Sequence, residues 1–275
     1  MNDRFFFRGQ IVPPPRSSVF GSVLLILLIL LFGLYQTHPF PDSVQPWVPR
    51  LILLLLPLSI ASRSIYTVHF NVLIVCYYLM RLFPHFPLYP FSNLTFLLLY
   101  VFVVMLIPPL RGSVGWLRTG KFDATTWSLV AITIVVPIVA LMLWVHFLSP
   151  DLGRYASMVP QFPMWLIALY AVANAMFNAA LEETIWRGVM LEALDSALGP
   201  GVWVLLIQAI SFGAAHYHNG FPNGIIGAAM AGIFGIMLGV IRRKSKGILA
   251  GWLAHTVVDA AIFTMIVYFI RETSG

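Results

Sequence analysis

The segment Val23–Phe32 reads VLLILLILLF, and Leu51–Leu56 reads LILLLL, so both are unbroken apolar runs. Strands of membrane barrels alternate apolar and polar residues, and neither segment does so. Only 9% of the residues are charged and 60% are hydrophobic, whereas soluble domains carry about 25% charged residues. The chain is therefore expected to lie in lipid, where backbone groups must be hydrogen-bonded within helices or closed barrels. The continuous runs favour helices.

Apolar runs of the length that crosses a bilayer, about 20 residues, recur along the chain. They predict an all-α, polytopic transmembrane helical bundle of about nine spans, at 18–36, 46–62, 64–82, 92–108, 124–148, 164–194, 202–217, 222–241 and 247–270. The second and third runs are so close that they could instead form one re-entrant pair, which would leave eight spans. In the eighth run, Gly235 and Gly239 have the spacing that lets membrane helices approach closely.

The distribution of Lys and Arg predicts the orientation, because cytoplasmic loops are enriched in both. With nine spans and a cytoplasmic N-terminus, the cytoplasmic segments hold Arg4, Arg8, Arg16, Arg63, Arg111, Arg118, Lys121, Arg242, Arg243, Lys244 and Lys246. The opposite side holds Arg81, Arg154 and Arg271. We therefore expect a multi-pass protein of the cell (inner) membrane. Membrane topology explains the net charge of +6, and no nucleic-acid partner is expected.

Ionisable residues inside membrane helices are costly, by about 2.5–3.5 kcal/mol on insertion scales, and mark candidate functional sites. In this chain they concentrate after residue 170, first in Leu181-Glu182-Glu183-Thr184-Ile185-Trp186-Arg187. Glu183 and Arg187 are four residues apart and can pair on one helical face, which leaves Glu182 available. Asn174 and Asn178 follow the face of Glu182. The alternative is a purely structural ion pair beside a helix-end glutamate.

Two histidine-containing stretches follow in later spans, Phe212-x-x-x-His216 and His255-x-x-x-Asp259. The second spacing places an imidazole and a carboxylate on one helical face. At 1.5 Å per residue, Glu182, His216 and His255 lie about 18, 21 and 12 Å from the cytoplasmic helix ends. We therefore expect a carboxylate and two imidazoles in one layer of the membrane.

This set of side chains suits hydrolysis by water. Glu182 in an apolar setting can act as a general base, His216 can position the water, and His255 can donate a hydrogen bond to the oxyanion. The sequence has neither a G-x-S-x-G nor an H-E-x-x-H motif, and the single Cys76 is expected to be a packing residue. No cofactor is expected. In the less favoured alternative, a zinc ion is held by Glu182, Glu183, His216 and His255.

The motifs Glu182-Glu183-x-x-x-Arg187, Phe212-x-x-x-His216 and His255-x-x-x-Asp259 resemble the three ordered motifs of the CPBP family. This family includes CAAX prenyl endopeptidases, bacterial abortive-infection proteins and bacteriocin-related proteases. The resemblance covers about 164–270 and implies a glutamic-type intramembrane protease that acts on a membrane-tethered protein or peptide. It also implies that a catalytic helical core at 151–275 follows N-terminal transmembrane helices of unknown role at 1–150.

The resemblance further implies roles for single residues. Glu182 and His216 would activate water, while His255 and Asp259 would stabilise the oxyanion. Glu183 and Arg187 would support the site, as would Phe212 of the second motif. Asp259 departs from the pattern, because relatives close to the prenyl endopeptidases usually have Asn there. An ionised Asp cannot donate a hydrogen bond, so Asp259 is either protonated or orients His255.

Two classes without protease activity compete with this interpretation. A proton-coupled transporter could use Glu182 and the histidines as a relay, but it should show broken helices or a paired internal repeat, and the sequence has no evident repeat. A membrane immunity or interaction protein could keep the same fold without proteolysis. The sequence carries no indication of the oligomeric state.

Overall fold

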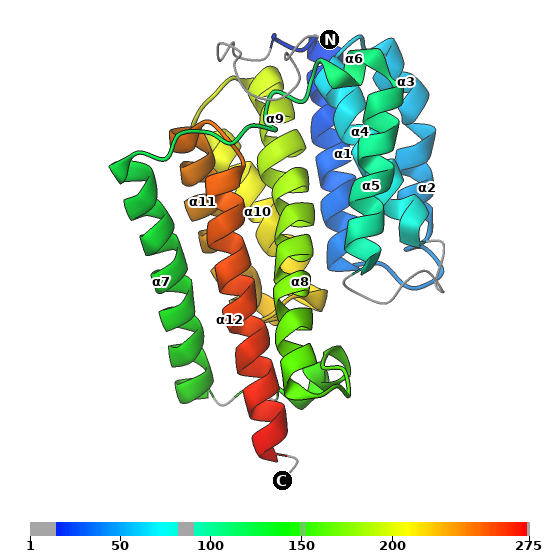
Figure 1. Ribbon diagram of the computed structural model, residues 1–275. Helices are drawn as coiled ribbons and strands as arrows, with labels where there is room; N and C mark the ends of the chain where they lie inside the picture. Colours follow the sequence, from blue (N-terminus) through cyan, green and yellow to red (C-terminus); the bar gives the residue numbers. More distant parts are fainter. Residues whose placement is uncertain (1–14, 82–90, 149, 151, 274–275) are drawn as a thin grey trace.

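The computed structural model describes residues 15–81, 91–148, 150 and 152–273, and it contains helices and no strands within these ranges (Figure 1). Arg4 and Arg8 lie outside the described residues. The helices are α1 (Val19–Thr37), α2 (Trp47–Leu54), α3 (Leu56–Ala61), α4 (Ile65–Arg81), α5 (Phe91–Leu106), α6 (Pro108–Arg111), α7 (Ala124–Leu148), α8 (Met164–Glu182), α9 (Leu191–Leu198), α10 (Val202–Asn219), α11 (Gly224–Ser245) and α12 (Leu249–Thr273). A 3₁₀ helix, Gly153–Met158, precedes α8, and a π-helical segment, Glu183–Met190, joins α8 to α9.

The predicted runs coincide with these helices, with two differences. The run 46–62 is divided into α2 and α3 at Leu55. Pro57 explains the break, because it lacks the N–H that would bond to the carbonyl of Leu53. The run 164–194 continues as a helical rod of 35 residues to Leu198, and it changes to π-helical geometry within the candidate site.

Among the described residues, five helical segments are long and apolar enough to cross a membrane: α1, α7, Met164–Leu198, α11 and Leu249–Ile270 of α12. Trp47–Ala61, Ile65–Met80 and Phe91–Leu106 are apolar but shorter. Helix α10 belongs to neither group. The chain is therefore an all-helical integral membrane protein, as the sequence predicted.

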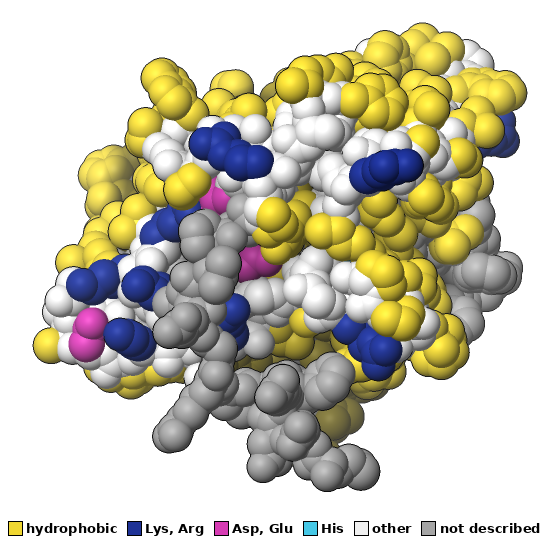
Figure 2. All heavy atoms as spheres, turned by 90° about the horizontal axis from the view of Figure 1, so that it is seen from above, with side chains coloured by type: hydrophobic (Ala, Val, Ile, Leu, Met, Phe, Trp, Pro, Cys, Tyr) yellow, Lys and Arg dark blue, Asp and Glu magenta, His cyan; other side chains and the backbone are white. Residues whose placement is uncertain are grey.

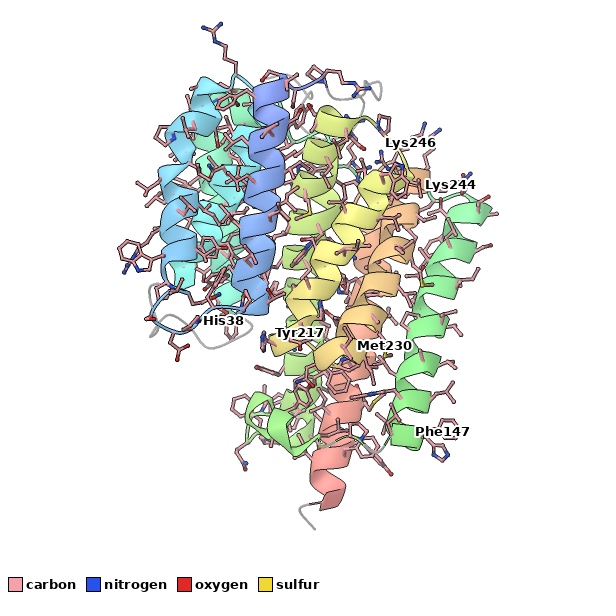
Figure 3. The ribbon with its side chains drawn as sticks, turned by 180° about the vertical axis from the view of Figure 1, so that it is seen from behind. His38, Phe147, Tyr217, Met230, Lys244 and Lys246 are labelled. Atoms are coloured by element: carbon pink, nitrogen blue, oxygen red, sulfur yellow. The ribbon has the colours of Figure 1, made fainter. Side chains whose placement is uncertain are left out.

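Successive helical rods alternate in direction. Helix α1 runs away from the face at which it begins, the α2–α3 rod returns, and the alternation continues until α12 ends at the opposite face (Figure 1). Lys and Arg gather on the face at which α1 begins, which Figure 2 shows from above. Lys244 and Lys246 lie at this end of the molecule, while Phe147 lies at the other end (Figure 3). The clustering of basic residues on one face agrees with the charge pattern of the sequence.

Two features fix the helices around the candidate site. Helix α11 packs closely on α10, where a Cβ on Gly213 would come within 2.4 Å of the Ala228 carbonyl oxygen and a Cβ on Gly235 within 3.1 Å of the Phe212 ring. The predicted glycine contact is thus confirmed. The segment before α7 is tied to the turn between α11 and α12 by backbone hydrogen bonds from Lys121 to Ser245 (2.7 Å) and from Ile248 to Arg118 (2.9 Å). Helix α7 therefore lies beside α11 and α12.

The N-terminal helices pack directly against the segment that carries the glutamates. Phe32 of α1 contacts Trp186, with ring centroids 5.8 Å apart, and Trp186 contacts Phe212 of α10 at 5.1 Å. These rings belong to one buried apolar core that extends from α1 to α12. Cys76 is also buried in this core, as expected. The proposed division at residue 150 stays a prediction.

Candidate functional site

The two glutamates lie where the helical rod changes geometry. Glu182 is the last residue of α8, and Glu183 begins the π-helical segment, all of whose residues are buried. Single π-helical turns inside α-helices occur frequently at functional sites. The predicted pairing is present, because Arg187 Nη1 lies 3.2 Å from Glu183 Oε1, and both side chains are inaccessible to solvent. The two carboxylates thus occupy different surroundings, as the sequence predicted.

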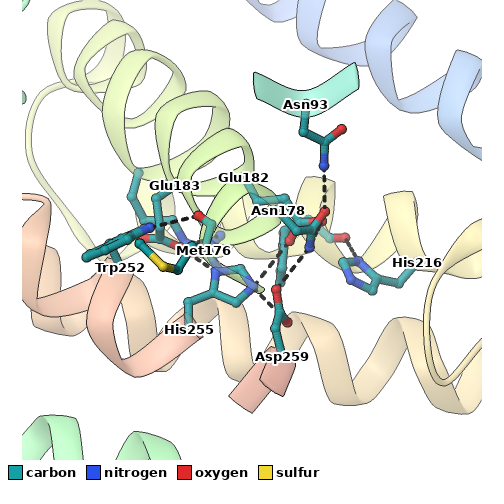
Figure 4. Close-up of polar contacts among 11 residues, drawn as sticks. Asn93, Met176, Asn178, Glu182, Glu183, His216, Trp252, His255 and Asp259 are labelled. Atoms are coloured by element: carbon teal, nitrogen blue, oxygen red, sulfur yellow. Dashed lines mark hydrogen bonds and ion pairs between the residues drawn. The ribbon is translucent and has the colours of Figure 1, made fainter. Parts of the chain in front are cut away.

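His255 of α12 lies among three carboxylates (Figure 4). Its Nδ1 lies 2.9 Å from Glu183 Oε1. Its Nε2 lies 3.3 Å from Glu182 Oε2 and 3.6 Å from Asp259 Oδ1. Because an ionised carboxylate only accepts hydrogen bonds, both ring nitrogens donate when these neighbours are ionised. The Nε2 contacts are the longer ones, so this nitrogen is the less tightly held of the two.

Asn178, one helical turn before Glu182, connects the carboxylates. Its Nδ2 donates to Glu182 Oε1 at 3.3 Å and to Asp259 Oδ2 at 3.0 Å. Its Oδ1 accepts a hydrogen bond from Asn93 Nδ2 of α5 at 3.2 Å. Figure 4 shows this chain of contacts from α5 through α8 to α12.

His216 is held by its own helix. Its Nδ1 donates to the carbonyl oxygen of Phe212 at 3.0 Å, because a carbonyl can only accept. In a neutral imidazole, the other nitrogen, Nε2, then carries the lone pair and can accept a proton or a hydrogen bond. The Phe212 ring contacts His216 on one side, with ring centroids 4.6 Å apart, and the Arg187 guanidinium lies over the ring at 4.1 Å from its centroid. Phe212 therefore separates the buried ion pair from His216.

A cavity of about 160 Å³ brings these groups together. Glu182, His216, His255 and Asp259 line it, as do Asn174 and Asn178. The rest of the lining is largely apolar and comes from α7, α10, α11 and α12, including Leu141, Met230 and Phe234. A polar cavity of this size holds several water molecules. It supplies the space for a hydrolytic water between side chains of three helices.

The structure places all the candidate residues in or beside this one site. Glu182, His216, His255, Asp259 and Phe212 line the cavity, and the ion pair of Glu183 and Arg187 lies directly behind it. The sequence analysis did not single out Asn93, which lies in the α5 run, where no motif marked it. Among the described residues, no group of three or more His, Cys, Asp or Glu side chains is arranged to hold a metal ion.

The fold and the site together place the protein in a class: integral membrane proteins in which carboxylates and imidazoles surround a cavity inside the helical bundle. Residues 160–261 match the family model of type II CAAX prenyl endopeptidase Rce1-like proteins. This match supports an assignment of the C-terminal part of the chain to the CPBP, or CAAX protease, family. No curated protein and no solved structure matches the chain. The matched segment includes all three sequence motifs and leaves out α1–α7.

Proposed function

We propose that the protein is an intramembrane endopeptidase that hydrolyses a peptide bond of a membrane-tethered protein or peptide. One observation carries the proposal: Glu182, His216 and His255, from three different helices, line one cavity with room for water. The family match supports a protease of the CAAX type in general. The geometry of the site supports water, rather than a side chain, as the nucleophile.

In the proposed mechanism, Glu182 accepts a proton from a water molecule that also donates a hydrogen bond to Nε2 of His216. The water oxygen forms a bond to the carbonyl carbon of the substrate, and the carbonyl oxygen becomes an oxyanion. Glu182 then transfers its proton to the amide nitrogen as the C–N bond breaks. The products are a carboxylic acid and an amine, so one water is consumed for each bond cleaved.

His255 is the proposed donor to the oxyanion. In the structure its Nε2 faces Glu182 and Asp259 at 3.3 and 3.6 Å, so the oxyanion would replace one of these two carboxylates as the acceptor. The shorter contact from Nδ1 to Glu183 supports this role, because it holds the ring while Nε2 changes partner. Donors already in place for a developing negative charge are a large source of rate enhancement.

Asp259 is proposed to orient His255 rather than to donate to the oxyanion itself. It lies one turn after His255 and contacts Nε2, and it accepts a hydrogen bond from Asn178. A carboxylate that accepts from both neighbours has no proton to donate. The proposed mechanism needs no metal ion or other cofactor.

We also propose nine passes through the cell (inner) membrane, with the N-terminus in the cytoplasm. The alternating direction of the helical rods and the gathering of Lys and Arg on the face at which α1 begins support this orientation. The shorter rods, such as Ile65–Met80, fall near the lower limit of about 17 residues for a spanning helix. The bilayer would have to thin locally around them.

A cleavage assay on the purified protein in lipid nanodiscs tests the proposal. The probes are a fluorescent farnesylated peptide that ends in a CAAX sequence and its unprenylated twin, and intact-mass measurement identifies the products. Glu182→Gln should reduce the cleavage rate by about 10²–10⁴-fold, the range that general-base catalysis supplies. Glu192→Gln is the matched control, because Glu192 pairs with Arg242 outside the cavity.

Unimpaired cleavage by a stably folded Glu182→Gln protein would overturn the proposal. If neither probe is cleaved, new protein N-termini are mapped in membranes of cells that express the wild type or Glu182→Gln. The proposal requires at least one N-terminus that appears only with the wild type. Identical maps would contradict proteolysis.

A further inference from the structure

A polar side chain from outside the family-matched segment reaches the candidate site. Asn93 belongs to α5, which packs beside α8, whereas the family match begins at residue 160. Its Nδ2 donates to Asn178 Oδ1 at 3.2 Å. The N-terminal helices are therefore connected to the carboxylates by hydrogen bonds as well as by apolar packing.

The orientation of the Asn178 amide follows from its neighbours. Both hydrogens of Nδ2 are directed to carboxylates, one to Glu182 and one to Asp259. If the amide were reversed, its oxygen would face two groups that only accept hydrogen bonds when ionised. Oδ1 must therefore point away from the carboxylates, and there it meets the donor of Asn93. The two amides form a chain with one consistent direction of donation.

We propose that Asn178 and Asn93 are positioning residues of the active site. This inference rests on the proposed function, because it assigns them the task of holding Glu182 and Asp259 for hydrolysis. Asn178 acts on both carboxylates directly. Asn93 acts through Asn178, by occupying the carbonyl oxygen that would otherwise lack a partner. Helix α5 thereby becomes part of the active site.

The geometry explains how a small shift would affect the reaction. Glu182 Oε1 is held by Asn178, and Glu182 Oε2 faces His255, so the carboxylate has a contact on each oxygen. Without Asn178, the carboxylate can rotate towards His255 and away from the water. Asp259 loses a donor at the same time, which frees it to move relative to His255. A misplacement of about 1 Å can cost up to about 100-fold in rate.

A matched pair of variants separates hydrogen bonding from packing. Asn93→Leu keeps the volume of the side chain without a charge but removes the donating nitrogen, whereas Asn93→Ala removes the side chain beyond Cβ. If Asn93 positions Asn178, both variants lower kcat, by about tenfold. If Asn93 only fills space, Asn93→Leu resembles the wild type. KM should change by less than about twofold in either variant, because Asn93 does not line the cavity.

Thr95→Ala is the control on the same helix. The Thr95 hydroxyl donates to the carbonyl oxygen of Phe91 within α5, so its loss should leave kcat and KM unchanged. Cleavage of the peptide probes described above is followed for all variants in nanodiscs. Wild-type kcat for Asn93→Leu would overturn the inference and leave the proposed function intact.

A double-mutant cycle tests the bridge without any substrate. The unfolding of Asn93→Ala, Asn178→Ala and the double variant is measured by titration with sodium dodecyl sulfate. Directly bonded residues should give non-additive effects, with the double variant less destabilised than the sum of the single ones. Additive effects would refute the bridge whether or not the wild type cleaves a probe. A non-additive cycle together with identical maps of new N-termini would support the bridge and contradict the proposed protease function.

Discussion

Replacing Arg187 with Met should destabilise the protein more than the loss of any ion pair at its surface. The Arg187 side chain is 0% exposed, and its carboxylate partner, Glu183, is 1% exposed. Apart from this 3.2 Å contact, the guanidinium nitrogens have no hydrogen-bond partner in the part of the chain that the structure describes. The guanidinium also lies over the Phe212 ring. The variant keeps an apolar side chain of similar length but leaves Glu183 without its cation.

Removing one partner of a buried ion pair typically costs about 3–5 kcal/mol, because the other charge stays buried and unpaired. Glu183 Oε1 keeps its contact with His255, so we expect the lower end, about 3 kcal/mol. Arg243→Met is the comparison, because Arg243 is 30% exposed although its partner Asp195 is only 8% exposed. That change should cost less than Arg187→Met, because water reaches the Arg243 side of the pair.

The assay is reversible unfolding in mixed micelles, followed by the fluorescence of tryptophan. The double variant Arg187→Met with Glu183→Gln should recover at least half of the lost free energy, because it removes both charges. The reasoning is refuted if Arg187→Met is no more destabilising than Arg243→Met. It is also refuted if the double variant is less stable than Arg187→Met alone, since Glu183 would then not depend on Arg187.

Three further predictions concern the site and its supports. Gly251→Ala would place a Cβ 2.9 Å from Glu183 Oε2, so it should lower proteolytic activity and cost about 1–3 kcal/mol of stability. Gly33→Ala, where a Cβ meets no described atom within 4 Å, is its control. The pKa of Asp123, which precedes α7, is lowered because the backbone N–H and then the hydroxyl of Thr126 donate to its carboxylate. This contribution to the start of α7 is present above the usual pKa of Asp and is lost as the pH falls through the lowered value, so acidification should lower the protection factors of the amides in the first turn, which compare each exchange rate with its intrinsic rate at the same pH. Asp123→Ala should lower these protection factors already at neutral pH and abolish their dependence on acid. Finally, activity should survive treatment with a zinc chelator, and elemental analysis should find no stoichiometric zinc; loss of activity that zinc restores would contradict the metal-free mechanism.

The sequence predicted the helical rods well because a segment that lies in lipid must satisfy its backbone hydrogen bonds internally. Each rod must hide its backbone polar groups inside a helix and present apolar side chains outside, so long apolar runs such as 18–36 and 124–148 coincide with α1 and α7. The break at Leu55 has a local cause in Pro57, whereas the π-helical geometry of Glu183–Met190 has no evident sequence signal. Its residues are all buried, so their surroundings are set by packing against other helices.

The main candidate residues could be found because charge inside a membrane is costly and therefore conspicuous. The helical spacing also predicted the contact between Glu183 and Arg187 and that between His255 and Asp259. Spacing could not predict contacts between different helices. Glu183 contacts His255 although 72 residues separate them in the sequence, and both nitrogens of His255 face carboxylates. Both features depend on how α12 packs against α8 and the π-helical segment that follows it.

By itself, the sequence determined that the chain is helical, that it lies in lipid and that conspicuous ionisable residues of its membrane helices follow residue 170, because each of these follows from the local cost of removing polar groups from water. Only the tertiary structure decided that Glu182, His216 and His255 share a cavity and that Asn93 of α5 reaches them through Asn178. The physical reason is that an uncharged Asn costs a membrane helix less than a charge does, so Asn93 does not stand out, whereas Asn178 was noticed because it follows the face of Glu182. The role of Asn93 depends on the direction of a hydrogen bond between helices, which exists only once they have packed.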